Sequence, residues 1–377
     1  MLHNKDIMSI EVRQTVRSMQ AYPPTKPLKE LQSELSLERI IRLSNNENAF
    51  GPSPSVVEAI KQAAETVNYY PDGSSIELKH AIQSRLGIPP HHLVFGNGSD
   101  DLIHMLGQAF LGRTDDEVVV GDPSFVRYDA TAQLIGCKLK KIPLDGQFRH
   151  NLPAMAKATT ENTKLLFIAN PNNPTGTIVH KTDVDAFLKD LPAQVLVILD
   201  EAYFEYTKHV SDYPISSDYV LDGKNVVGLR TFSKAYALAG LRVGYAIASS
   251  EVVDALERVR EPFNVNSAGQ LAAIAALNDT DYLEATLFRN AKGLKRISDA
   301  IKQAGGTPCE SYANFVWADM GRPAKPIFHG LLQRGIVVRS GDAMGCPNCL
   351  RISVGHEDEV AAFVEALRAS MKEVLAV

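Results

Sequence analysis

The chain has 377 residues, and 39 Lys and Arg against 44 Asp and Glu give a formal charge of 39 − 44 = −5. Hydrophobic residues make up 45% and charged residues 22%, which are ordinary globular values and exclude disordered, collagen-like and coiled-coil chains. So mild a charge offers no basic surface to nucleic acid or to a membrane. No apolar run approaches the ~18 residues of a membrane span, and the charged N-terminus lacks a signal core. Because four cysteines do not make a disulfide framework, we expect a cytoplasmic protein.

The first predicted element is an N-terminal arm over residues 1–45. Its segment AYPPTKPLKEL contains three prolines and two lysines, which favour an extended surface course over a helix. A helix is then predicted to begin after Ser53, a good N-cap, with Pro54 in the first turn. The apolar face of this helix is formed by Val57, Ile60, Ala64 and Val67.

Short, continuous apolar runs follow, and they predict strands that are buried on both faces. These runs lie at 117–123, 164–171, 194–201, 225–232 and 243–248. Helical patterns separate them, as at 182–191 and 250–260. Strands that alternate with helices indicate an α/β fold, with a mainly parallel sheet sandwiched between helices.

The pattern changes after about residue 256. Long helical patterns lead to apolar strands and to a last amphipathic helix, and their ranges are 267–278, 282–304, 314–319, 335–340, 350–355 and 360–374. We expect a large domain over 46–255 and a smaller α+β domain over 256–377, which the arm of residues 1–45 joins.

Chemically useful side chains follow the predicted strands. Asp200-Glu201-Ala202-Tyr203, the NPNNPTG segment at 170–176 and Thr231-Phe232-Ser233-Lys234 each come directly after an apolar run, and GNGSD at 96–100 precedes a helix. Ligands bind beyond the carboxyl ends of strands in an open parallel sheet, so these segments should converge. A nucleophilic lysine beside an acid and a phosphate-sized nest of small residues is what Schiff-base chemistry on pyridoxal phosphate requires.

These motifs also carry a family resemblance. In chain order they are SNNENAFGP (44–52), YYP (69–71), GNGSD (96–100), NPNNPTG (170–176), DEAY (200–203), TFSKAYALAGLRVGY (231–245) and LRISVG (350–355). The set resembles the fold-type I, pyridoxal-phosphate-dependent aminotransferases of class II, and most of all the histidinol-phosphate aminotransferases. The resemblance implies transamination of L-histidinol phosphate with 2-oxoglutarate to give imidazole acetol phosphate and L-glutamate, a step of histidine biosynthesis. It also implies a homodimer with a shared active site.

The resemblance assigns a role to each residue of the reacting centre. Lys234 would form the Schiff base with the cofactor and move the proton between substrate and cofactor. Asp200 would pair with the pyridine nitrogen and keep it protonated, because opposite charges favour both charged forms. Tyr203 and Asn173 would hydrogen-bond the phenolic oxygen of the cofactor, and Phe125 would stack on its ring.

A second group of residues is predicted to hold the cofactor phosphate. A helix that begins at GNGSD offers backbone N–H groups and a favourable dipole to a dianion. The predicted phosphate ligands are Gly98, Ser99, Asp100, Thr231, Ser233 and Arg242, with Tyr70 reaching in from the neighbouring subunit.

The substrate side is predicted from weaker matches. Arg351 resembles the arginine whose planar guanidinium forks onto a carboxylate. Arg339 could supply a second cation for the substrate phosphate. Tyr22 and Asn48 match family positions that line the substrate pocket.

Several alternatives remain open at this point. An aromatic amino-acid aminotransferase or a threonine-phosphate decarboxylase would share the cofactor motifs. A non-catalytic regulator would need a DNA-binding extension, for which the proline-rich arm is unsuited. Cys346 and Cys349 form a CxxC, but they lack the second pair or the histidines of a zinc site, so we predict free thiols and no metal.

Overall fold

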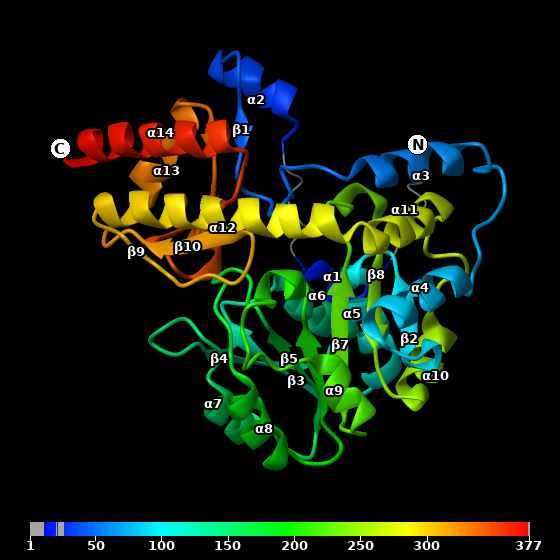
Figure 1. Cartoon of the computed structure of the whole chain (residues 1–377). Coiled ribbons are helices and arrows are strands. Elements are labelled where there is room, and N and C mark those ends of the chain that lie inside the picture. The colour runs from blue at the N-terminus through cyan, green and yellow to red at the C-terminus, as the bar shows by residue number, and fades with distance from the viewer. Residues whose placement is uncertain (1–10, 20, 22–25, 376–377) are drawn as a thin grey trace, which may run out of the picture.

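The computed structural model describes residues 11–19, 21 and 26–375, and it shows a large α/β domain beside a smaller one (Figure 1). The described residues form a seven-stranded sheet in the large domain, in the order β2-β8-β7-β6-β5-β3-β4. These strands are β2 (Leu93–Gly96), β3 (Glu117–Asp122), β4 (Lys138–Pro143), β5 (Thr163–Ala169), β6 (Leu196–Asp200), β7 (Val226–Thr231) and β8 (Gly244–Ile247). Strand β8 pairs antiparallel with both neighbours, whereas the other pairs are parallel. The predicted mainly parallel α/β sheet is confirmed.

Helices cover both faces of this sheet because its strands are apolar on both faces. Along β5, Leu166 and Ile168 belong to one buried core, while Leu165 and Phe167 belong to the core on the opposite face. The helices of the large domain are α3 (Pro54–Ala64), α4 (Ile76–Leu86), α5 (Ser99–Phe110), α6 (Val126–Ile135), α7 (Leu152–Ala158), α8 (Lys181–Lys189), α9 (Ser216–Leu221), α10 (Ser250–Val259) and α11 (Ser267–Asn278). Three 3₁₀ turns, η1 (Pro90–His92), η2 (Phe204–Thr207) and η3 (Ala239–Leu241), lie between these elements in the described part of the chain.

Helix α3 begins as predicted, because the Ser53 hydroxyl accepts from the Val56 N–H and Pro54 occupies the first turn. It ends a turn earlier than predicted. Glu65 is its C-cap, so Val67 lies beyond the helix and is 72% exposed.

The small domain contains a four-stranded antiparallel sheet and a two-stranded parallel one in the described residues. Their strands are β9 (Thr307–Pro308), β10 (Phe315–Asp319), β12 (Arg339–Ser340) and β13 (Cys349–Ser353), and β1 (Ile41–Arg42) with β11 (Ile336–Val337). Helices α12 (Thr280–Gln303), α13 (Lys325–Gln333) and α14 (Glu357–Leu375) and the 3₁₀ turn η4 (Asp342–Met344) complete it. The single strand predicted at 335–340 is two short strands, which join different sheets.

The predicted domain boundary at 255/256 stays a prediction. Beyond it in the chain, helix α11 packs against α3 and α4, where Ala272 and Ala273 join the core that contains Val56 and Leu78. The long helix α12 then extends from the large sheet towards the small domain (Figure 1).

The arm contacts both parts of the molecule. Helix α1 (Gln14–Arg17) packs on α6 of the large domain, and Arg13 donates to the Leu134 carbonyl at 3.0 Å. Strand β1 pairs with β11 of the small domain. Part of the segment predicted to be extended is helical, because α2 (Leu28–Leu35) begins directly after Pro27. Within the described ranges of the chain, no helix is long and apolar enough to cross a membrane.

Candidate active site

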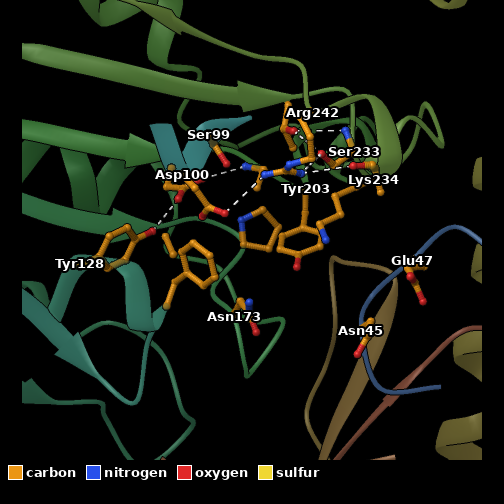
Figure 2. Close-up of a pocket in the computed structure, with 17 residues that line it drawn as sticks. Asn45, Glu47, Ser99, Asp100, Tyr128, Asn173, Tyr203, Ser233, Lys234 and Arg242 are labelled. Carbon is orange, nitrogen blue, oxygen red and sulfur yellow. Dashed lines mark hydrogen bonds and ion pairs between the residues drawn. The ribbon is translucent and has the colours of Figure 1, made fainter. Parts of the chain in front are cut away.

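A pocket of about 230 Å³ opens where β5, β6 and β7 end and α5 begins (Figure 2). Ten of the residues predicted from the sequence line it: Ser99, Asp100, Phe125, Asn173, Asp200, Tyr203, Thr231, Ser233, Lys234 and Arg242. They come from strand ends, loops and a helix N-terminus that are far apart in the chain, so the parallel sheet brings them together, as expected of this strand edge. The lining also includes Asn45, Glu47 and Tyr128, to which the sequence analysis gave no role.

Lys234 lies in the turn after β7, and its amine projects into the pocket (Figure 2). The Nζ donates to the Asn46 carbonyl at 3.3 Å. Burial, together with the nearby positive charge of Arg351, lowers the pKa of Lys234 to about 8. A substantial fraction of this amine is therefore neutral near physiological pH, which is the form that attacks a carbonyl.

Asp200 ends β6 and is 4% exposed. Its Oδ2 accepts from the Tyr128 hydroxyl at 2.6 Å, and its Oδ1 accepts from the Ala202 N–H at 3.2 Å. Burial raises the pKa of Asp200 to about 6, because the described residues give this carboxylate no ion-pair partner. A buried carboxylate of this kind suits a ligand that brings a positive charge of its own, such as a protonated pyridine.

Two further polar side chains, those of Tyr203 and Asn173, line the pocket. Tyr203 is 3% exposed, and its hydroxyl accepts from the Asn46 amide at 3.0 Å. Burial raises the pKa of Tyr203 to about 12, so it keeps its proton. Asn173 also lines the pocket and accepts a hydrogen bond from Arg351.

The far end of the pocket forms a cradle for an anion. Gly98 precedes α5 with φ of +80°, and a Cβ there would lie 2.4 Å from the Arg242 Nη2. Arg242 reaches Asp100 at 3.4 Å and the Ser233 hydroxyl at 3.5 Å. The Thr231 hydroxyl donates to that of Ser233 at 2.9 Å. A helix N-terminus, an arginine and two hydroxyls are the donors that a phosphate dianion needs.

Phe125 lines the pocket just before α6, and its ring meets Tyr128 edge-on at a centroid distance of 5.7 Å. Tyr128 was missed by the sequence analysis. Its only local signal is a position three residues after Phe125, and nothing local indicates that its hydroxyl reaches Asp200 across the sheet.

The predicted substrate residues are not all in the pocket lining. Arg351 lies on β13 beside the pocket, is 8% exposed, and donates to the Ser44 carbonyl at 2.7 Å and to Asn173. Arg339 is exposed on β12 and does not line the pocket. Tyr22 lies outside the described residues.

Asn48 and Tyr70 occupy other places. The Asn48 amide donates to the carbonyls of Lys234 and Ala235 at 3.2 and 3.0 Å, so it supports the loop of the catalytic lysine from outside the pocket lining. Tyr70 is 82% exposed and stacks on Phe263 at a centroid distance of 4.7 Å. Tyr70 does not line this pocket.

The four cysteines, all of which fall in the described ranges, are free thiols. Burial raises the pKa of both Cys346 and Cys349, which opposes formation of a reactive thiolate. Among the described residues, no three His, Cys, Asp or Glu side chains are grouped so that they could hold a metal ion.

The donor set in this pocket fits pyridoxal phosphate, because one lining holds a group of anion donors, the amine of Lys234 and the buried carboxylate of Asp200, which has no ion-pair partner among the described residues. Comparison with known proteins agrees with this reading of the site. The family described as aminotransferase class I and II matches residues 38–367, and the chain belongs to this family. The resemblance read from the sequence motifs is confirmed.

The relatives are more specific than the family. The histidinol-phosphate aminotransferase of Moorella thermoacetica is 43% identical over 94% of this chain and 92% of its own length. A crystal structure of histidinol-phosphate aminotransferase from Sinorhizobium meliloti, in complex with pyridoxal 5′-phosphate, superposes with a TM-score of 0.89 at 31% identity, covering 97% of this chain and 98% of that one. The L-threonine-O-3-phosphate decarboxylase of Porphyromonas gingivalis shares the fold, with a TM-score of 0.77 at 19% identity over 88% of this chain and 100% of that one.

Proposed function

We propose that this protein is a pyridoxal-phosphate-dependent aminotransferase that transfers the amino group of L-histidinol phosphate to 2-oxoglutarate, with imidazole acetol phosphate and L-glutamate as products. The observation that carries the proposal is the grouping of Lys234, Asp200 and the Arg242 cradle in one pocket. The histidinol-phosphate aminotransferases that match the full length of the chain support the choice of donor.

The side chains divide the work as follows. Pyridoxal phosphate, when bound, withdraws electrons from the donor Cα. Lys234 is neutral often enough to accept the Cα proton as general base and to return it as general acid. The cradle at Arg242 and the α5 N-terminus would hold the phosphate, and Asp200 would pair with the ring nitrogen. Phe125 restricts the plane in which the ring can lie.

The two substrates demand a site that accepts different anions. The donor carries a phosphate and no carboxylate, whereas 2-oxoglutarate carries two carboxylates. A guanidinium fork suits both, so we assign this role to Arg351. Arg351→Lys keeps the charge but removes the fork, so both half-reactions should slow. Arg339→Gln tests the remaining assignment. If Arg339 contacts the donor phosphate, its loss should slow the reaction with L-histidinol phosphate more than the reaction with phenylalanine.

We further propose a cytoplasmic homodimer that shares its active sites. The exposed aromatic stack of Tyr70 and Phe263 supports it, because large exposed apolar side chains mark subunit interfaces. Further exposed apolar residues are Val57, Val67, Tyr69, Ile76 and Leu271. In such a dimer, Tyr70 would reach the cofactor phosphate of the neighbouring subunit.

A half-reaction screen tests the donor. The protein loaded with pyridoxal phosphate is mixed with one donor at a time, and the loss of the cofactor absorbance is followed by stopped flow. L-Histidinol phosphate should react fastest. A faster reaction with phenylalanine would identify an aromatic amino-acid aminotransferase, and release of carbon dioxide from threonine phosphate would identify the decarboxylase. Absence of reaction with every donor would favour a non-catalytic regulator.

A further inference from the structure

Tyr128 lines the pocket, and the proposed reaction has not yet used it. It lies in the first turn of α6, is 1% exposed, and stacks on Phe167 at a centroid distance of 4.4 Å with an interplanar angle of 15°. Because the ring is buried and stacked, its hydroxyl has little freedom to leave the Asp200 Oδ2, which lies 2.6 Å away. Figure 2 shows Tyr128 at the edge of the pocket.

The direction of this hydrogen bond follows from the two groups. Burial and the charge of Asp200 raise the pKa of Tyr128 well above its usual range, so the phenol keeps its proton and donates. A hydrogen bond donated to a carboxylate favours the ionised form, whereas burial of the same carboxylate favours the neutral form. The hydrogen bond from Tyr128 therefore lowers the pKa of Asp200, whereas burial raises it.

The charge state of Asp200 matters because Asp200 and a pyridine nitrogen in the pocket would share one proton. If the carboxylate is poorly solvated, that proton moves to the carboxyl group and the ring becomes neutral. A neutral ring withdraws electrons from the donor Cα less strongly than a protonated one. Whatever stabilises the charge on Asp200 thus keeps the ring cationic.

We propose that Tyr128 is a positioning residue, whose hydroxyl holds Asp200 as a carboxylate so that the shared proton resides on the ring nitrogen of the cofactor. The bond also fixes the carboxylate plane, since Tyr128 holds Oδ2 and the Ala202 N–H holds Oδ1. This inference rests on the proposed function, because it requires pyridoxal phosphate in the pocket.

The test uses the holoenzyme loaded with pyridoxal phosphate that carries ¹⁵N in its ring. Tyr128→Phe keeps the ring and its stack on Phe167 and removes only the hydroxyl. The ¹⁵N chemical shift should move from the pyridinium value towards that of neutral pyridine. The rate of Cα proton removal should fall by about 10-fold to 150-fold, as expected for one lost hydrogen bond to a charged group, while KM for the donor changes little.

Tyr219→Phe is the matched control. Tyr219 is another buried tyrosine, 6% exposed, and its hydroxyl donates to Asp185 at 2.7 Å outside the pocket lining. Its loss should leave the ¹⁵N shift unchanged. Replacement of Tyr128 by 3-fluorotyrosine serves as a second variant that keeps both ring and hydroxyl; its more acidic hydroxyl should hold the shift at the pyridinium value.

Asp200→Asn separates this role from simple packing. In that background, Tyr128→Phe should change neither the shift nor the rate any further. Either of two results would overturn this inference without affecting the proposed function. One is a ¹⁵N shift in Tyr128→Phe equal to that of the unmodified enzyme. The other is an equal effect of Tyr128→Phe on the rate with and without the Asp200 carboxylate. Failure of the unmodified protein to take up pyridoxal phosphate would instead overturn the proposed function, and the inference with it.

Discussion

The lowered pKa of Lys234 makes a quantitative prediction about how fast the protein captures its cofactor. Burial, together with the charge of Arg351, lowers this pKa from 10.5 to about 8, a difference of 10.5 − 8 = 2.5. At pH 7 the neutral fraction of the amine is then about 10%, against about 0.03% for an ordinary lysine, a ratio of about 300. Because only the neutral amine attacks an aldehyde, the rate of covalent capture should rise with pH and level off above about 8.

The assay mixes apoenzyme with pyridoxal phosphate between pH 6 and pH 10, traps the covalent link with borohydride at intervals, and counts labelled protein by mass spectrometry. Peptide mapping should place the label on Lys234. Arg351→Gln removes a positive charge that lowers the pKa, so the midpoint should move upward. Arg368→Gln, which changes an exposed arginine on α14, should leave the midpoint where it is. A midpoint near 10.5, or a label on another lysine, would refute the reasoning.

Three further predictions concern the cradle, the core and the assembly. Gly98→Ala places a Cβ against a guanidinium and strains a residue at φ +80°, so the equilibrium affinity for pyridoxal phosphate should fall, as measured by fluorescence titration of apoenzyme. Arg230→Ala leaves the fully buried Glu201 without its partner at 2.7 Å and should lower the free energy of unfolding in urea by about 3–5 kcal/mol. Mixing Lys234→Ala with Tyr70→Ala subunits should restore partial activity, and sedimentation of the active enzyme as a monomer would contradict the shared site.

The sequence predicted the sheet well, because strands buried on both faces leave continuous apolar runs that local pattern alone reveals. It did not predict that β8 runs antiparallel to its neighbours, since direction depends on where the chain crosses and not on side-chain pattern. The packing partner of a helix is hard to predict for a related reason. Helix α11 is rich in alanine over much of its surface, so its sequence does not indicate which domain it packs against.

The residues of the site also fall into those that the sequence predicts and those that it does not. Residues such as Lys234 and Asp200 were predictable, because they directly follow strands and sit in recognisable motifs. Tyr128 and Asn46 act through tertiary contacts, with hydrogen-bond partners far away in the sequence. Arg339 matched a pattern, but the split of its predicted strand into β11 and β12 leaves it exposed at the start of a short strand. Pattern therefore located the reacting groups, and only the folded chain shows what holds them.

Asn46 connects the small domain with the amine of Lys234. Its carbonyl accepts from the Lys234 Nζ and, at 3.0 Å, from the Asn314 amide of the small domain. Its side chain donates to the Tyr203 hydroxyl and accepts from the Ser353 hydroxyl on β13 at 2.9 Å. Any rigid-body displacement of the small domain must stretch or exchange these bonds. Domain movement and the environment of Lys234 are thus mechanically coupled through the backbone and side chain of Asn46.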